Sequence, residues 1–260
     1  MKNKKLLIII GVVVLLAVGG VGGFLAFNKK DSGNNANSGM DYAKTAGKAY
    51  DEAKEKNVEE AEDPYESKVD FEGLQAINPD VYAWIRIPGT NIDYPVLQNA
   101  DEPNDYYLNR TMDGQVGLPG SIYTEKYNNT GFNDPVTVVY GHTLHDGTMF
   151  SELKKYTDKE FFDENQYIYI HLPGGRKVFQ IFAAVAFDDR YLMGSYAFTY
   201  DEDFNKYISE LKSSLEGNVN DSIDVKFGTP VLTLSTCIDE YPEKRWLVNA
   251  VLVDEEWYNE

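Results

Sequence analysis

Cysteine is almost absent from this sequence: the 260 residues contain a single one, Cys237, and only three histidines. One thiol forms no disulfide within its own chain, and so few thiol and imidazole ligands rule out a typical zinc site. The sequence also lacks CxxC and HExxH motifs and has no GxGxxG or GxxxxGK(S/T) loop for phosphate groups. A disulfide scaffold, a typical zinc site and a nucleotide-binding loop are therefore not predicted.

Basic residues are few relative to acidic ones. The chain has 24 lysines and arginines against 42 aspartates and glutamates, for a formal net charge of -18. Residues 1–30 hold five lysines and no acid, so the rest of the chain is more acidic still. Such a surface repels phosphate backbones, which argues against nucleic acid as a partner. The acids are interpreted as a solvated surface, since no EF-hand-like run is present.

One long uncharged segment is present, LLIIIGVVVLLAVGGVGGFLAF at residues 6–27. At about 1.5 Å per helical residue, this run is long enough to cross a hydrocarbon layer about 30 Å thick. The lysines in residues 1–5 place a short tail in the cytoplasm and everything after residue 27 outside the cell. A cleaved signal peptide is the alternative, but residues 24–29 form a poor cleavage site. The sequence thus predicts a single-pass protein of the cell membrane.

The composition changes twice after this segment. Residues 28–68 are predicted to be a linker or stalk, with a flexible polar part at 31–40 and a solvated helix within 41–62. Large apolar side chains are few within that helix and become frequent further along the chain. Residues 69–260 are therefore expected to form the folded, extracellular domain.

Short apolar or alternating runs follow one another along residues 69–260. Eight of them are predicted as strands: 82–87, 92–98, 120–125, 135–142, 166–172, 176–187, 229–237 and 245–253. Four are predicted as helices: 71–77, 149–156, 158–165 and 201–217. Because strands and helices do not alternate, these runs favour a mostly β fold, a closed antiparallel or mixed barrel.

Cys237 ends the strand-like run 229–237 and is the candidate nucleophile. A thiol attacks as a thiolate, which requires a nearby base or positive charge. His142 directly follows an apolar strand, where rigid scaffolds often place functional side chains. His145 lies three residues further in a loop, and His171 ends a strand and is interpreted as structural or surface. His142 is therefore the first candidate for the base, although Cys237 could also be a buried, inert residue.

Arg245 lies eight residues beyond Cys237 and opens the next predicted strand. If the two strands are neighbours, both residues face the same end of the barrel. A guanidinium is always charged there and is suited to hold a developing oxyanion or a substrate backbone. The alternative is a surface arginine paired with Asp239, Glu240 or Glu243 of the same loop.

These residues resemble a known family. TLSTC at 233–237 matches the TLxTC motif of sortases, the membrane-anchored cysteine transpeptidases of Gram-positive bacteria, and His142 and Arg245 stand in the family's chain order. The resemblance is strongest to class B and extends from about Phe71 to Leu252. The similar segments are WIRIPGTNIDYPVLQ (84–98), DYYLNRTMDGQVGLPGSIY (105–123), GHTLHDGTMFSEL (141–153) and a helix-bearing insertion around 188–217.

The resemblance implies an eight-stranded sortase barrel with N-terminal helices and a helix between strands six and seven. It also implies a reaction in which Cys237 attacks the threonine carbonyl of a C-terminal sorting motif, NPxTx-like in class B. An amine of peptidoglycan or of a pilin then releases the acyl-enzyme. His142 would act as general acid and base, and Arg245 would stabilise the oxyanion.

The resemblance further implies a substrate groove. The residues that fall at its positions are Asn104, Leu108, Tyr191, Leu192, Ser235 and Thr236. Ile238 departs from the pattern, because some relatives have an acidic residue at that position. The implied partners are secreted proteins that carry a sorting signal, the accepting amine and the membrane, with no metal or cofactor. Two other hypotheses stay open: an exported cysteine hydrolase that uses the same Cys-His pair with water, and a non-catalytic envelope protein.

Overall fold

The computed structural model describes residues 36–258, with side chains from residue 47 onward. The expected tail at 1–5 and the apolar run at 6–27 lie outside this range. Within the described part of the chain, no helix is long and apolar enough to cross a membrane. Residues 43–260 group into one compact unit, which contains all the strands.

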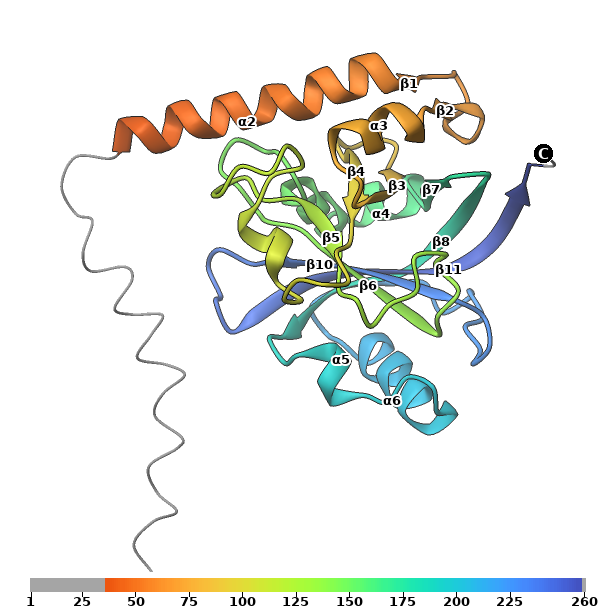
Figure 1. The fold of residues 1–260 in the computed structure, drawn as a ribbon. Coiled ribbons are helices and arrows are strands. Elements are labelled where there is room, and N and C mark those ends of the chain that lie inside the picture. Colours follow the sequence, from red (N-terminus) through yellow and green to blue (C-terminus); the bar gives the residue numbers. More distant parts are fainter. Residues whose placement is uncertain (1–35, 259–260) are drawn as a thin grey trace, which may run out of the picture. The chain divides into compact units, whose positions relative to one another are not determined.

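Eight strands close into a barrel (Figure 1). They are β3 (Val81–Arg86), β4 (Asp93–Leu97), β5 (Ile122–Thr124), β6 (Val136–Tyr140), β7 (Tyr167–Leu172), β8 (Gly175–Asp188), β10 (Val231–Cys237) and β11 (Lys244–Trp257). Their order is β11-β10-β6-β5-β4-β3-β7-β8, and β8 pairs back with β11 along its whole length. The β4–β5 and β6–β10 pairs are parallel and the others antiparallel. The prediction of a closed, mixed barrel is confirmed.

Helices and short strands surround the barrel. They are α2 (Ala36–Asn57), α3 (Phe71–Ile77), α4 (Lys159–Glu164), α5 (Leu192–Ser195) and α6 (Asp201–Lys212), the 3-10 helices η1 (Pro64–Glu66), η2 (Tyr106–Asn109) and η3 (Ser151–Thr157), and the strands β1 (Val58–Glu59), β2 (Lys68–Val69) and β9 (Gly217–Val219). The segment predicted as a helix at 149–156 is thus a 3-10 helix. The insertion with α5 and α6 lies between β8 and β10, the sixth and seventh barrel strands, as expected.

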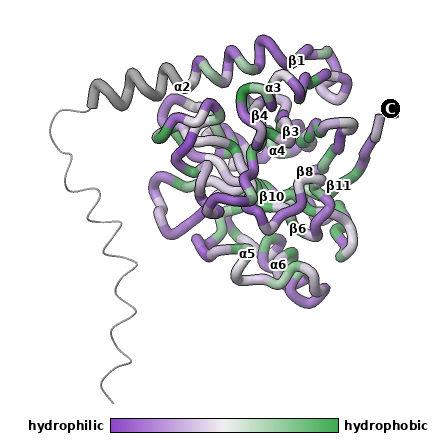
Figure 2. Tube along the Cα trace, viewed as in Figure 1, coloured by the Kyte–Doolittle hydropathy of each residue, from purple (hydrophilic) through white to green (hydrophobic). Residues whose placement is uncertain are grey.

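Two apolar clusters form the core. The larger fills the barrel interior, and the smaller packs the insertion against the barrel. In α6 the buried residues Phe204, Tyr207, Ile208 and Leu211 recur at helical spacing and form one face. Figure 2 shows hydrophobic residues along the central strands, whereas the described part of α2 is mainly hydrophilic.

The helix expected within 41–62 is present as α2, but it is not fully solvated. Tyr50, Ala53 and Asn57 are buried at spacings of three and four residues, so they lie on one helix face. Composition does not reveal this face, because alanine and asparagine add little hydrophobicity to a sequence rich in lysine and glutamate. Residues 43–68 therefore pack with the domain that follows them.

Candidate active site

The ends of two parallel strands place Cys237 beside His142. β10 and β6 are paired in register, with Ser235 opposite Tyr140. Continuing this register by two residues brings Cys237 level with His142, and the period of two puts both side chains on the face that Ser235 and Tyr140 share. The thiol of Cys237 is exposed and forms no disulfide. A buried, inert cysteine is therefore not what the structure contains.

Arg245 is the direct cross-strand partner of Cys237. β10 and β11 are antiparallel, and Cys237 and Arg245 form the last pair of their ladder. Residues directly opposite each other in such a pair have Cβ atoms about 4.5–5.5 Å apart on the same face. The Arg245 guanidinium donates through Nη1 to the carbonyl oxygens of Pro242 (2.9 Å) and Lys244 (2.8 Å). Among the described residues it forms no ion pair, so pairing with the loop acids is not observed.

The ring of His142 is held by a backbone carbonyl. Its Nε2 atom lies 2.6 Å from the oxygen of Leu108, in η2. A carbonyl oxygen only accepts hydrogen bonds, so Nε2 carries a proton. In the neutral ring Nδ1 is then the atom with a free lone pair, and it is the atom available to exchange a proton.

Two threonines tie the histidine loop to the cysteine strand. The hydroxyl of Thr143 lies 2.9 Å from the carbonyl oxygen of Cys237 and 2.8 Å from the hydroxyl of Thr236. The hydroxyl of Thr236 in turn lies 2.7 Å from the carbonyl oxygen of Gly141. These hydrogen bonds fix the end of β6 relative to the end of β10, which keeps His142 and Cys237 in register beyond the last ladder pair.

A family model described as the Sortase domain matches residues 85–253, which is more than half of the chain. The chain belongs to the sortase family. Sortase B of Staphylococcus aureus is 32% identical to it over 187 residues, which cover 70% of this chain and 74% of the relative. Sortases of this family are cysteine transpeptidases of the cell envelope, so the protein is an enzyme and the non-catalytic hypothesis is set aside.

Solved structures identify the class. A Bacillus anthracis sortase B structure has a TM-score of 0.68 and 30% identity, and covers 83% of this chain and 99% of its own. A Staphylococcus aureus sortase B-substrate complex matches with a TM-score of 0.62 and 31% identity. The match covers 71% of this chain and 85% of the chain in that complex. The sortase described here is thus of class B, as the sequence motifs predicted.

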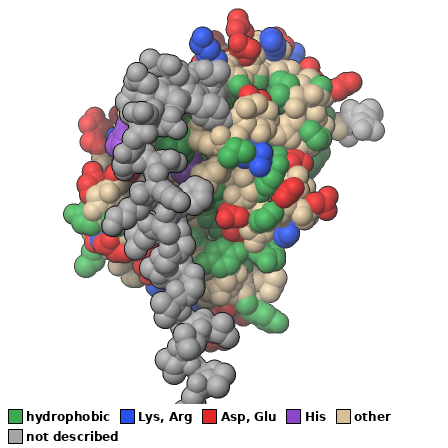
Figure 3. All heavy atoms as spheres, turned by 60° about the vertical axis from the view of Figure 1, so that its left-hand side comes forward, with side chains coloured by type: hydrophobic (Ala, Val, Ile, Leu, Met, Phe, Trp, Pro, Cys, Tyr) green, Lys and Arg blue, Asp and Glu red, His purple; other side chains and the backbone are tan. Residues whose placement is uncertain are grey.

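The predicted groove residues of this sortase differ in exposure. Tyr191 is exposed, and Asn104 and Leu108 are half-buried. The side chains of Leu192, Ser235 and Thr236 are buried: Leu192 packs into the smaller core cluster. Tyr191 and Leu108 therefore offer side-chain surface to solvent, whereas the backbones of Ser235 and Thr236 are paired with both neighbouring strands or their ends. Figure 3 shows acidic side chains spread over the visible face of the molecule, with few basic ones.

Glu125 and Tyr140 were not predicted from the sequence. The hydroxyl of Tyr191 donates to the Glu125 carboxylate (2.6 Å), which links the insertion to the end of β5. Burial raises the pKa of Glu125. The hydroxyl of Tyr140 and Oδ1 of Asn104 are buried and have no hydrogen-bond partner in the described structure. The only sequence signal for Tyr140 is its place two residues before His142, at the end of the same strand. Glu125 has no such signal.

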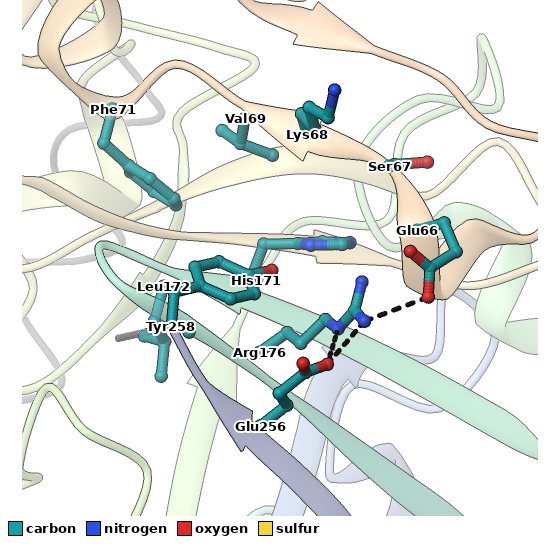
Figure 4. A pocket seen from close by; sticks show the side chains of 11 residues that line it. Glu66, Ser67, Lys68, Val69, Phe71, His171, Leu172, Arg176, Glu256 and Tyr258 are labelled. Carbon is teal, nitrogen blue, oxygen red and sulfur yellow. Dashed lines mark hydrogen bonds and ion pairs between the residues drawn. The ribbon is translucent and has the colours of Figure 1, made fainter. Parts of the chain in front are cut away.

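A pocket of about 440 Å³ lies far from Cys237, at the β7–β8 hairpin (Figure 4). Gly175, in its wall, pairs with Trp257, twelve residues along β11 from Arg245. Arg176 in this pocket pairs with Glu66 and Glu256. His171 is buried here rather than at the surface, its Nε2 atom has no hydrogen-bond partner among the described residues, and it stands apart from the strand ends that carry Cys237 and Arg245.

His171 makes folding stability depend on pH. Burial, and then the charges of Arg86 and Arg176, lower its pKa to about 4. The unfolded chain binds a proton at this residue below its ordinary pKa of about 6.5, whereas the folded protein binds one only as the pH falls to about 4. The contribution of neutral His171 to the free energy of unfolding is therefore fully present above about pH 6.5 and is lost as the pH falls toward 4. The total loss is on the order of 3 kcal/mol. Urea unfolding at pH 7 and pH 4.5 will measure this loss.

The matched comparison uses two single-residue variants. His171→Gln should remove most of this pH dependence, because glutamine does not titrate. His145→Gln, in the exposed loop, should leave it unchanged. Equal slopes of unfolding free energy against pH in wild type and His171→Gln would contradict the assignment.

The described residues contain no group of three or more His, Cys, Asp or Glu side chains arranged to hold a metal ion. The candidate site lies at the ends of β6, β10 and β11, where the structure brings together a thiol, an imidazole and a guanidinium.

Proposed function

We propose that Cys237, His142 and Arg245 carry out transpeptidation on secreted proteins with an NPxTx-like C-terminal sorting motif. The observation that supports this most directly is the strand register, which brings all three to one end of the barrel. Family membership supplies the reaction class, and the register supplies the candidate residues for it.

The proposed reaction has two acyl transfers. The thiol proton of Cys237 passes to Nδ1 of His142, Sγ attacks the threonine carbonyl carbon, and the carbonyl oxygen gains negative charge near the Arg245 guanidinium. His142, protonated at Nδ1, gives this proton to the leaving amine, and the thioester forms as the peptide bond breaks. An incoming amine then loses a proton to Nδ1 and attacks the thioester, which releases the thiolate and restores an amide bond.

Arg245 is suited to this position by its geometry. Two hydrogen bonds from Nη1 to backbone carbonyls hold the guanidinium plane, which leaves its other N–H groups available. A preorganised donor of this kind stabilises the developing oxyanion without reorganisation during the reaction.

The groove of the proposed enzyme includes Asn104, Leu108, Tyr191, Leu192, Ser235 and Thr236, the positions that the family resemblance implies. The accepting amine belongs to peptidoglycan or to a pilin. A class B sortase of Streptococcus pyogenes with a similar fold is involved in pilus biogenesis, which supports the second source.

The proposed location follows from the N-terminal sequence. Residues 6–27 would anchor the protein in the cell membrane with residues 1–5 in the cytoplasm. Residues 28–42 would link this anchor to the catalytic domain outside the cell, with which residues 43–68 pack, and where sorting-signal substrates and wall or pilin amines are found. Residues 6–27 contain no charged side chain, which supports their proposed place in the membrane.

Peptide cleavage with and without an added amine tests the proposal. The full chain in detergent, given an NPxTx-like peptide and triglycine, should yield the peptide joined to glycine at the threonine. The amine should raise total turnover, because it resolves the thioester faster than water does. If hydrolysed peptide is the only product and the amine changes neither rate nor product, the enzyme is a hydrolase and transpeptidation is wrong.

A further inference from the structure

The hydroxyl of Tyr50, on helix α2, joins the two limbs of the loop between β4 and β5. It donates a hydrogen bond to the carbonyl oxygen of Gly120 (2.6 Å) and accepts one from the backbone N–H of Met112 (3.1 Å). Met112 belongs to the limb that leaves β4, and Gly120 to the limb that returns to β5. Tyr50 is buried, and burial raises the pKa of its hydroxyl, so the donated proton is retained at any physiological pH.

The same loop carries the hydrogen-bond acceptor of His142. Leu108, whose carbonyl oxygen lies 2.6 Å from Nε2 of His142, stands in the outgoing limb. The returning limb packs directly behind this carbonyl: a Cβ atom on Gly120 would lie 2.4 Å from the Leu108 oxygen and 3.1 Å from Cδ2 of His142. The limbs are also joined by hydrogen bonds from the N–H of Ser121 to the carbonyl of Tyr107 (3.0 Å) and from its hydroxyl to the carbonyl of Arg110 (2.7 Å), and the Tyr50 hydroxyl lies 3.0 Å from this same hydroxyl. Tyr50 therefore completes a junction beside the carbonyl that fixes the imidazole, and a change in this junction would move that carbonyl.

The ring of Tyr50 is also linked to the segment that follows His142. It packs edge-to-face on Tyr94, with ring centroids 5.9 Å apart and planes at 90°. The hydroxyl of Tyr94 accepts the backbone N–H of Met149 (3.2 Å), and Phe150 donates its N–H to the carbonyl oxygen of His142 (2.9 Å). Tyr50 thus contacts the β4–β5 loop directly and the 149–150 segment through Tyr94, and His142 is hydrogen-bonded to both segments.

We infer that Tyr50 is a positioning residue, through which helix α2 sets the orientation and tautomer of the catalytic histidine. The inference rests on the proposed role of His142. It makes α2 part of the catalytic apparatus, although this helix lies outside the barrel and outside residues 85–253, which the family model matches.

Tyr50→Phe tests this inference, because it removes one oxygen atom and keeps the ring. We expect kcat for peptide transfer to fall about tenfold with KM unchanged, since a misplaced acid-base group loses part of the 10²–10⁴-fold that such a group contributes. Tyr156→Phe is the matched control: its buried hydroxyl also donates to a backbone carbonyl, that of Asn165, but it lies in η3 and does not contact the β4–β5 loop. This control should keep the wild-type kcat.

A spectroscopic measurement separates positioning from a general loss of stability. With ¹⁵N-labelled histidine in the full chain, only three imidazoles give signals. At a pH where His142 is neutral, wild type and Tyr156→Phe should carry its proton on Nε2. Tyr50→Phe should show a substantial population with the proton on Nδ1, because the Leu108 carbonyl no longer selects one tautomer.

His142→Ala separates failure of this inference from failure of the proposed function. If His142→Ala retains transfer activity, the proposed function is wrong and the inference falls with it. If His142→Ala is inactive, the positioning role alone is overturned by any one of three results for Tyr50→Phe. These are a kcat within twofold of wild type, an unchanged Nε2 tautomer, or a loss of kcat no larger than that of Tyr156→Phe.

Discussion

Cys237→Ala will lower the rate of peptide cleavage by at least about 10⁴-fold, because no nucleophile is left to form the thioester. The chain holds no second cysteine that could replace it. The side chain is exposed, so its removal creates no cavity and should leave the midpoint of thermal unfolding unchanged. The loss should therefore appear in kcat, measured by chromatography of peptide products, while the variant still binds the peptide.

Binding and labelling measurements complete this test. Fluorescence anisotropy with a labelled NPxTx-like peptide should give a similar Kd for wild type and Cys237→Ala. Treatment of the wild type with an alkylating agent should inactivate it in step with modification of this single thiol. Cleavage by Cys237→Ala within tenfold of wild type, or activity that survives full alkylation, would remove the cysteine mechanism altogether.

Gly120→Ala will lower kcat by about a hundredfold, which is the cost that a displacement of about 1 Å can impose on catalytic geometry. Gly120 has a φ of +68°, and its added Cβ would lie 2.4 Å from the carbonyl oxygen of Leu108. The backbone must move, and the acceptor of His142 moves with it. Steady-state kinetics of peptide transfer measure the effect, which should be larger than that of Tyr50→Phe because the clash is direct.

Gly114→Ala is the control for backbone strain. Gly114 lies in the same loop with a φ of +81°, but a Cβ atom there would meet nothing within 4 Å. Both variants force alanine into a left-handed conformation, and Gly120→Ala adds the clash with the Leu108 carbonyl, so it should lose more stability than Gly114→Ala. Only Gly120→Ala should lose most of its kcat. If the two variants lose equal activity, loop strain and not the position of the Leu108 carbonyl is responsible.

Local sequence patterns predicted the strands and most helices closely. β3, β7 and β10 begin and end within two residues of the predicted runs, because alternating or continuous apolar residues followed by Gly and Pro turns are local signals. The helix predicted at 201–217 ends earlier, at Lys212, since residues 217–219 pair with β8 as β9. Here a tertiary contact replaced the local preference.

The candidate site was predicted in part. The sequence singled out His142, Cys237 and Arg245, and the structure brings them to one end of the barrel, while their roles stay predictions. The contacts that position them came only from the structure. Neither the Leu108 carbonyl that holds His142 nor the Tyr50 hydroxyl has a sequence signal, because each joins segments separated by 34 or more residues.

The sequence by itself determined the strand and helix segments, the single thiol and the acidic surface, because each depends on residue type and on neighbours a few positions away. The tertiary structure decided which of these segments meet. The parallel register of β6 and β10 places residues 142 and 237 side by side, and the antiparallel turn into β11 sets Arg245 opposite Cys237. A shift of one residue in either pairing would turn these side chains to opposite faces, because side chains alternate along a strand. Register depends on the packing of the whole barrel, and no short stretch of sequence contains it.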